Sequence, residues 1–489
     1  MTRSLHCVLL LVLFLALNAD VLRAFLLPAY MYYDYQRILE LLIFAGITLA
    51  LLCSRGLKNQ WIETYQTLPK IAQVLIPLFF SLGFLSCFAS KANSASYLWV
   101  AHLAVLFVSA LYLTAIAKIH PPRFSKFVLG FLIFSLGYYI LSEWMSYGIV
   151  QFLTHRYPHF VIDQDVLTEM LRFPGYGNPR FLSQVISWTL PLIVLPLLYC
   201  WEKRQYGLAL FFFILATGWW EMYWLNQSRA LYLEAFVTAI LLSLIFRQSA
   251  KPYLLAQSLS ALSGALLFIL CFVISQLIPE RSLVNFEEMD RIKLWEIAAT
   301  LIKHHPWLGV GPLHYARYSG AYDVMHPHNS FLLFTSEWGI PAGLIFLGLA
   351  FAGLFAWTKK VRILSSSPNK FLLMGLTGSL FSGAMNAQVS GTLVMPMSQI
   401  LFALIGGWAL AEYQKSQSST ISLKITLLKT VLLRGVLLGL AGIVVWGVFP
   451  EVEYLPEETL QACIIATDSL HPTRCVLMPA YWGDHPAKE

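Results

Sequence analysis

The sequence has few charged residues: Asp, Glu, Lys and Arg make up only 12% of its 489 residues. Soluble domains carry about 25% of these residues, whereas this chain is 58% hydrophobic. Apolar runs of about 18–22 residues recur along its length, and runs of that length cross a bilayer as helices. The composition therefore predicts an all-α, polytopic membrane protein rather than a set of soluble domains.

The sequence also lacks a basic tail or a basic stripe, although its formal net charge is +7. Lys and Arg lie mainly in short connections between the apolar runs, where such residues set membrane topology. A protein that binds nucleic acid would instead gather them on one face or in one tail. This distribution excludes nucleic acid as a partner and leaves membrane lipids as the surroundings of the chain.

No internal repeat is evident either, and the apolar runs follow one another as about 12–13 predicted spans. They cover residues 5–22, 38–53, 71–89, 97–117, 127–148, 183–200, 207–225, 231–246, 254–278, 330–357, 371–390, 396–412 and 427–449. The first run resembles a signal peptide, but we interpret it as an uncleaved span because other spans follow at once. Residues 1–449 then form one membrane domain, and residues 450–489 form a short tail.

The positive charges predict the orientation of these spans. With the N-terminus in the cytoplasm, short basic connections such as residues 118–126 and 359–370 lie in the cytoplasm, as the positive-inside rule requires. The opposite short connections, residues 91–96 and 388–395, contain almost no cations. The longer segments on that outer side are residues 150–182, 279–329 and 450–489. The C-terminus is therefore expected outside.

The tail carries two of the seven cysteines, Cys463 and Cys475. The other five fall in or beside apolar runs, where a thiol behaves as a small hydrophobe. In an oxidising compartment Cys463 and Cys475 are expected to form a disulfide that closes a short loop. Two unrelated free thiols are the alternative.

Residues 279–329 form the largest polar segment between two spans, the ninth and the tenth. From Asp290 onward the pattern predicts a helix with Ile292, Trp295, Ala299 and Ile302 on one face. That face is expected to lie on the bundle or at the lipid interface, which leaves Arg291 on the outer side. The helix is expected to end at His304-His305-Pro306, because proline disfavours the helical conformation of the residue before it.

His328 lies where the tenth predicted span begins. The amide groups at a helix N-terminus disfavour an imidazolium, so a neutral imidazole that can accept a proton is expected there. The alternative is an interfacial histidine that merely caps the helix together with Asn329. A zinc site is a further alternative for the histidines of this region, but their spacing matches no common ligand pattern: His304, His305, His314, His326 and His328.

Arginines occur in three segments on the predicted outer side. Arg229 lies in a very short turn between two spans, Arg172 and Arg180 flank a Gly-rich segment before the sixth span, and Arg291 lies in the long loop. Guanidinium groups bind phosphate oxygens in bidentate fashion, so this set suits a phosphorylated lipid. For Arg229 alone, snorkelling to a lipid phosphate is an equal alternative.

The order of these motifs resembles the O-antigen ligase/polymerase superfamily over residues 227–347. The matching positions are Ser228-Arg229, Arg291 with Trp295, Pro306-Trp307-Leu308-Gly309-Val310-Gly311, His328-Asn329 with Leu332, and Glu337 with Gly339. The resemblance implies a helical glycosyltransferase in the inner membrane of a Gram-negative envelope. Its donor would be an undecaprenyl-diphosphate-linked glycan, taken on the periplasmic face.

The resemblance also implies roles for residues. Arg229 and Arg291 would hold the diphosphate, and His328 would act as base on the acceptor hydroxyl, with inversion and without a metal or another cofactor. Further substrate-binding positions are expected at Arg172, Arg180, Trp295, His326, Asn329 and Glu337. For Glu337, a structural hydrogen bond to the loop is an equal alternative.

The acceptor is open at this point. Lipid A-core is the first expectation, because ligases are the commonest reading of this motif set. The outer tail favours a pilin-type protein acceptor instead, although it is too short to resemble a full repeat domain, and an O-antigen polymerase is third. A lipid-linked glycan flippase is the competing class. Transporters tend to carry paired repeats and ionisable groups near the bilayer midplane. In this chain the conspicuous cations lie in the predicted outer loops, which favours chemistry at the membrane surface over transport.

Overall fold

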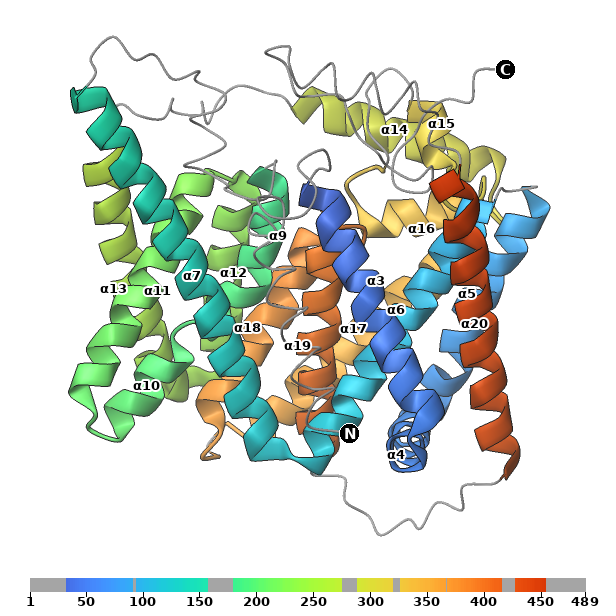
Figure 1. Cartoon of the computed structure of the whole chain (residues 1–489), viewed down its shortest axis with the longest axis horizontal. Coiled ribbons are helices and arrows are strands. Elements are labelled where there is room, and N and C mark those ends of the chain that lie inside the picture. Colours follow the sequence, from blue (N-terminus) through green and yellow to red (C-terminus); the bar gives the residue numbers. More distant parts are fainter. Residues whose placement is uncertain are drawn as a thin grey trace.

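The structure is a computed structural model that describes residues 32–90, 94–156, 179–274, 288–319, 326–365, 367–415 and 427–453. Every regular element in these residues is a helix (Figure 1). The all-α prediction is therefore confirmed. The first predicted span, Arg172 and the two tail cysteines lie outside the described residues.

Nine stretches of the described residues are long and apolar enough to cross a membrane. They are Gln36–Cys53, Lys70–Ala89, Ser94–Ile119, Pro121–Leu153, Pro179–Glu202, Tyr206–Asn226, Arg229–Val273, Ile340–Ile363 and Leu428–Trp446. The longest divides at Arg247, which has a left-handed φ of 50°, into α12 (Arg229–Phe246) and α13 (Lys251–Phe268). Two further helices, α18 (Lys370–Asn386) and α19 (Pro396–Lys415), run inside the bundle (Figure 1).

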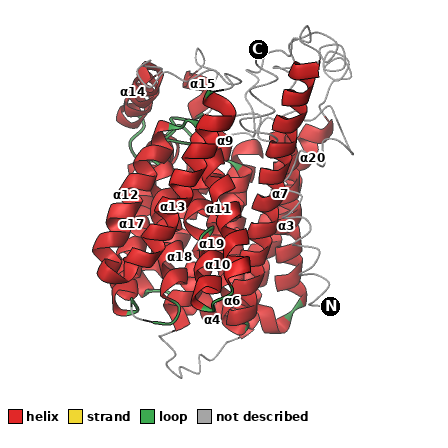
Figure 2. Cartoon of the chain, turned by 90° about the vertical axis from the view of Figure 1, so that its left-hand side faces the viewer, coloured by secondary structure: helices red, strands yellow, loops and turns green. Residues whose placement is uncertain are grey.

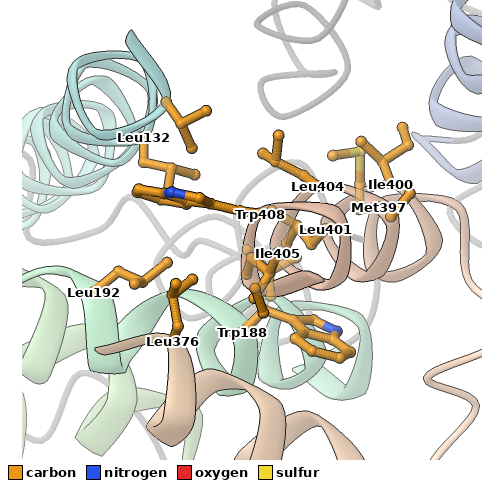
Figure 3. Close-up of a cluster of buried hydrophobic side chains, with 14 of the residues drawn as sticks. Leu132, Trp188, Leu192, Leu376, Met397, Ile400, Leu401, Leu404, Ile405 and Trp408 are labelled. Atoms are coloured by element: carbon orange, nitrogen blue, oxygen red, sulfur yellow. The ribbon is translucent and has the colours of Figure 1, made fainter. Parts of the chain in front are cut away.

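The centre of the bundle consists of α6 (Ser94–Ile119), α9 (Pro179–Thr189), α18 and α19, whose side chains are mostly buried. Trp188 of α9 and Trp408 of α19 fill this centre among leucines and isoleucines from neighbouring helices (Figure 3). Helices at the periphery, such as α5 (Lys70–Ala89) and α17 (Ile340–Ile363), instead expose large apolar side chains. Such side chains suit contact with lipid, because lipid tails are as apolar as they are.

Helices α14 (Glu288–His304), α15 (Tyr315–Ser319) and α16 (Ser330–Trp338) lie together at one end of the bundle, here called the α14 end (Figure 1). Figure 2 shows α14 and α15 at this end from the side. The amphipathic α4 (Arg55–Gln66) lies at the opposite end (Figure 1). The long polar loop and the basic residues of α4 thus occupy opposite ends, as the sequence predicts. Which end faces the cytoplasm stays a prediction.

The predicted start of the tenth span, residues 330–357, is wrong. Gly339 has φ of 90° and separates the short α16 from α17, and Pro341 stands in the first turn of the new helix. Glycine tolerates this backbone conformation, and proline is accepted in the first turn of a helix but not in its interior. The membrane-crossing helix therefore begins at Ile340, and α16 lies across the α14 end (Figure 1).

Backbone hydrogen bonds attach the loop after α14 to the break between α16 and α17. Val310 N donates to Ser336 O at 3.0 Å, Gly311 N to Glu337 O at 2.9 Å, and Ile340 N to Pro306 O at 2.8 Å. The Ser86 hydroxyl of α5 lies 2.7 Å from the same Glu337 carbonyl. Irregular backbone at a membrane surface is thereby supplied with partners, which its polar groups require.

We expect Gly339→Ala to lower the free energy of unfolding by about 2 kcal/mol or more, from backbone strain and a backbone clash. An added Cβ would lie 2.2 Å from Trp307 O, a backbone atom that cannot rotate away. Gly348→Ala in α17 is the control, because no atom lies within 4 Å of its added Cβ. Thermal unfolding of the purified proteins measures the difference, and equal melting temperatures would contradict this account of the break.

Candidate active site

Two arginine-bearing segments meet at the α14 end. Asn226, in the turn before α12, donates from Nδ2 to Pro179 O at 2.8 Å, and Pro179 begins α9. The turn closes through Gln227, whose φ is 52°. Arg229 is the first residue of α12 and Arg180 the second of α9. The hydrogen bond therefore holds the starts of these two helices side by side, as expected for a shared anion site.

The structure brings Arg180 next to His328. Arg180 Nη1 lies 3.4 Å from His328 Nε2, a long hydrogen bond between residues that are 148 positions apart in the chain. A guanidinium group only donates, so the lone pair of the neutral imidazole must be on Nε2 and its proton on Nδ1. The nitrogen that could accept a proton thus faces the arginine side of the site.

His326 contacts both the backbone and the ring of His328. His326 Nδ1 accepts the hydrogen bond of His328 N at 3.1 Å, and the two rings meet edge to face at 4.4 Å. His328 has a left-handed φ of 52°, a conformation that is uncommon for residues with a side chain and is often found at functional sites. The pair is a local unit in which His326 sets the backbone of His328.

Asn329 is the N-cap of α16. Its Oδ1 accepts from Leu332 N at 2.9 Å, and its Nδ2 donates to Gln388 O at 3.1 Å. An N-cap asparagine satisfies amide groups that the first turn of a helix leaves unpaired. Asn329 therefore caps the helix, while the His328 ring itself is directed to Arg180. A contact between Asn329 and substrate stays a prediction.

Arg291 lies on the inward side of α14, so its expected outward position is wrong. The buried stripe of this helix is Leu294, Ala298 and Leu301, and Arg291 continues it as a half-buried residue. The expected face is turned outward, with Ile292 54% exposed. Both faces of the helix are apolar, and the buried face packs on Val310 and Tyr315. The spacing of apolar residues alone cannot predict which of two apolar faces makes this contact.

Trp295 connects α14 to the histidine segment. Its indole Nε1 donates to Pro327 O at 2.9 Å, and Pro327 stands between the two histidines. Pro327 has no backbone N–H, but its carbonyl still needs a donor where water is excluded. Trp295 therefore fixes the position of α14, which carries Arg291, relative to the segment that carries His328. Its role in binding substrate stays a prediction.

Glu337 is buried in α16 and bonds to the loop. Its Oε1 accepts from Tyr315 N at 3.3 Å, and its carbonyl accepts from Gly311 N. The side chain is 1% exposed. Of its two alternatives, the described contacts match the structural one, in which the carboxylate holds the start of α15.

The two histidines are held neutral. Burial lowers the pKa of His328 well below its usual value, and the proximity of His326, Arg180 and Arg291 lowers it further. Burial and then Arg180 likewise lower the pKa of His326. Desolvation and nearby positive charge both disfavour an imidazolium. The neutral imidazole expected at His328 therefore has two physical causes, neither of which is the helix N-terminus that suggested it.

Several residues of the site gave no signal in the sequence. Gly391 lies against His326, and Ser86 bonds to the loop from α5. Neither stands in a recognisable motif. Among the residues that the structure describes, no group of three or more His, Cys, Asp or Glu side chains is placed to hold a metal ion.

Residues 192–347 match a family model described as O-antigen ligase. Over these residues the chain is similar to the O-antigen ligase family. The matched residues of this ligase-family domain include Arg229, Arg291 and His328, whereas Arg180 lies before them. No curated protein matches the chain. The resemblance drawn from the ordered motifs is confirmed, and the α14 end is where its residues gather.

We expect Arg180→Gln to raise the pKa of His328, because it removes a positive charge that disfavours the imidazolium. Diethylpyrocarbonate modifies neutral imidazole, so labelling of His328 would then decline at higher pH than in the wild type, between about pH 7 and about pH 4. Peptide mass spectrometry measures the profile. Arg180→Lys, which keeps the charge, is the control, and identical profiles for all three proteins would contradict the assigned electrostatics.

Proposed function

We propose that this protein transfers a glycan from an undecaprenyl-diphosphate carrier to an acceptor hydroxyl at the periplasmic face of the inner membrane. The observation that carries the proposal is the 3.4 Å approach of Arg180 Nη1 to His328 Nε2 in a chain with an O-antigen ligase domain. A cation for the leaving group and a neutral base for the nucleophile thereby stand next to each other.

The arginines suit a diphosphate. Arg180, Arg229 and Arg291 come from α9, α12 and α14, and all three elements reach the α14 end. A diphosphate leaves as an anion, so preorganised positive charge stabilises the bond-breaking step. Guanidinium groups match phosphate oxygens in pairs and stay charged at every relevant pH. The arginine set supports a leaving-group site that needs no general acid.

His328 is proposed as the base. Once a diphosphate binds, its charge offsets that of Arg180 and Arg291, which removes two of the causes that depress the pKa of His328. Arg180 can then turn to the phosphate and release Nε2. Donor binding would therefore raise the basicity of His328 at the moment when the acceptor needs it.

The proposed step is a single displacement. The acceptor oxygen forms a bond to the anomeric carbon as the bond from that carbon to the phosphate oxygen breaks. The electron pair leaves with undecaprenyl diphosphate, and the acceptor proton passes to His328 Nε2. Attack opposite the leaving group inverts the anomeric configuration, and the imidazolium later returns its proton to solvent.

We expect His328→Ala to slow glycan transfer by about 100-fold to 10,000-fold, the usual contribution of a general base. The measurement is transfer by purified protein in liposomes from a lipid-linked glycan to purified lipid A-core. His304→Ala is the control, because His304 is exposed at the end of α14. Transfer by His328→Ala at the wild-type rate would remove this residue from the mechanism.

We propose lipid A-core as the acceptor, and a deletion strain tests this choice. Loss of the lipopolysaccharide ladder, restored by the wild-type gene, is the expected result. A lighter pilin with an intact ladder would reassign the acceptor to protein. Glycan accumulation on the cytoplasmic leaflet, with no transfer in liposomes, would instead indicate a flippase, since a flippase forms no glycoconjugate.

A further inference from the structure

The connection between α18 and α19, residues 387–395, lies directly against the histidine segment. Ser330 N donates to Ala387 O at 2.8 Å, and Asn329 Nδ2 donates to Gln388 O. Gly391 lies under His326, so that an added Cβ would be 2.6 Å from His326 Nε2. A side chain at this position would displace the imidazole. The α18–α19 connection is therefore the surface on which His326 and Asn329 rest.

The far side of this connection is fixed by Arg37, a residue of α3 (Tyr32–Cys53). Arg37 Nη2 donates to Val394 O at 2.6 Å, and Gln399 Nε2 donates to Leu393 O at 2.8 Å. Arg37 Nη1 in turn contacts Gln399 Oε1 at 2.5 Å. Two consecutive carbonyls of the connection are thus held by one buried side-chain network.

Arg37 is held in place by Glu40 and His102. Its Nη1 is bonded to the Glu40 carboxylate and lies 3.0 Å from His102 Nε2. Arg37 is 2% exposed, and Glu40 and His102 are fully buried. Desolvating such charges is costly, and ionisable groups inside a membrane bundle point to function by default. Arg37 bonds to Glu40, to Gln399 and to the carbonyl of Val394, so we look for its function in the connection that it holds.

A second network fixes the start of the connection. Asn386 ends α18, and its Nδ2 donates to Glu234 Oε1 of α12 at 2.8 Å and to Ser187 Oγ of α9 at 3.0 Å. Thr392 Oγ1 donates to Asn386 Oδ1 at 2.7 Å, which closes the connection on itself. The connection is therefore fixed both at Asn386 and at Val394, and Gly391 lies between the two points.

We propose that Arg37 is a positioning residue for His328. Arg37 donates a hydrogen bond to Val394 O, in the same connection as Gly391, and Gly391 lies against the ring of His326. His326 Nδ1 in turn accepts the hydrogen bond from the backbone N–H of His328. The effect on catalysis rests on the proposed function, whereas the mechanical link from Arg37 to His328 does not. Displacing a catalytic group by about 1 Å slows a reaction by about 100-fold, so loss of this support affects the rate while donor binding persists.

The first test removes the ion pair without leaving a buried charge. In Arg37→Gln with Glu40→Gln, we expect kcat to fall about tenfold or more while KM for the lipid-linked donor stays within about twofold. Glu221→Gln is the control, because it removes a buried carboxylate that Trp144 of α7 (Pro121–Arg156) contacts, away from the connection. Its kcat is expected to match the wild type.

Hydrogen exchange gives a readout that needs no activity. The amides of His328 and Ser330 donate to His326 Nδ1 and Ala387 O, so both should exchange faster in the Arg37→Gln, Glu40→Gln protein. Exchange in peptides of α11 (Tyr206–Asn226) should be unchanged. If the wild type transfers no glycan but exchange responds in this way, the proposed function fails and the mechanical link stands.

A double-mutant cycle tests the link at Gly391 even if the Arg37 variant does not fold. We expect Gly391→Ala to lower kcat about tenfold in the wild type and less than about twofold in a His326→Ala background, because the clash needs the imidazole. Equal effects in both backgrounds, or unchanged exchange and kcat in the Arg37→Gln, Glu40→Gln protein, would overturn the proposal while leaving glycan transfer intact.

Discussion

The need to pair every polar backbone group at the membrane surface shapes the α14 end of this protein. Between α14 and α17 the described chain forms only the short helices α15 and α16. Further pairing comes from bonds between distant segments: Val310 with Ser336, Ile340 with Pro306, and Ser330 with Ala387. Each such bond also fixes the relative position of two segments that are far apart in the chain. These bonds therefore hold the described segments of the site in place relative to one another.

This constraint explains how residues from four segments come to lie together at the α14 end. The turn at Asn226 is tied to Pro179, and Trp295 ties α14 to Pro327. Burial and the positive charges of Arg180 and Arg291 then lower the pKa of His328, and burial and Arg180 lower that of His326, so both imidazoles are neutral. Positive charge and a neutral imidazole next to it are consequences of the same packing.

The sequence predicted the helical bundle, the polar loop and the arginine segments, because apolar run length and charge placement are local properties. It placed the start of the tenth span ten residues too early, because α16 belongs to the same apolar run and the membrane-crossing helix begins only at Ile340, after the break at Gly339. The predicted outward position of Arg291 was also wrong, because α14 has two apolar faces and the packing of one of them on Val310 and Tyr315 decides which is buried. The positions of Gly391 and Arg37 could not be predicted, because they depend on contacts between residues that are far apart in the sequence.

The central claim is that a lipid diphosphate binds among Arg180, Arg229 and Arg291 with its glycan beside His328. A cryo-electron microscopy structure of the protein in nanodiscs with an undecaprenyl-diphosphate-linked glycan tests this directly. The account predicts phosphate density within hydrogen-bond distance, about 3 Å, of at least two of these guanidinium groups, with the first sugar facing His328 Nε2. Phosphate density at the opposite end of the bundle, or between helices near the bilayer midplane, would contradict it.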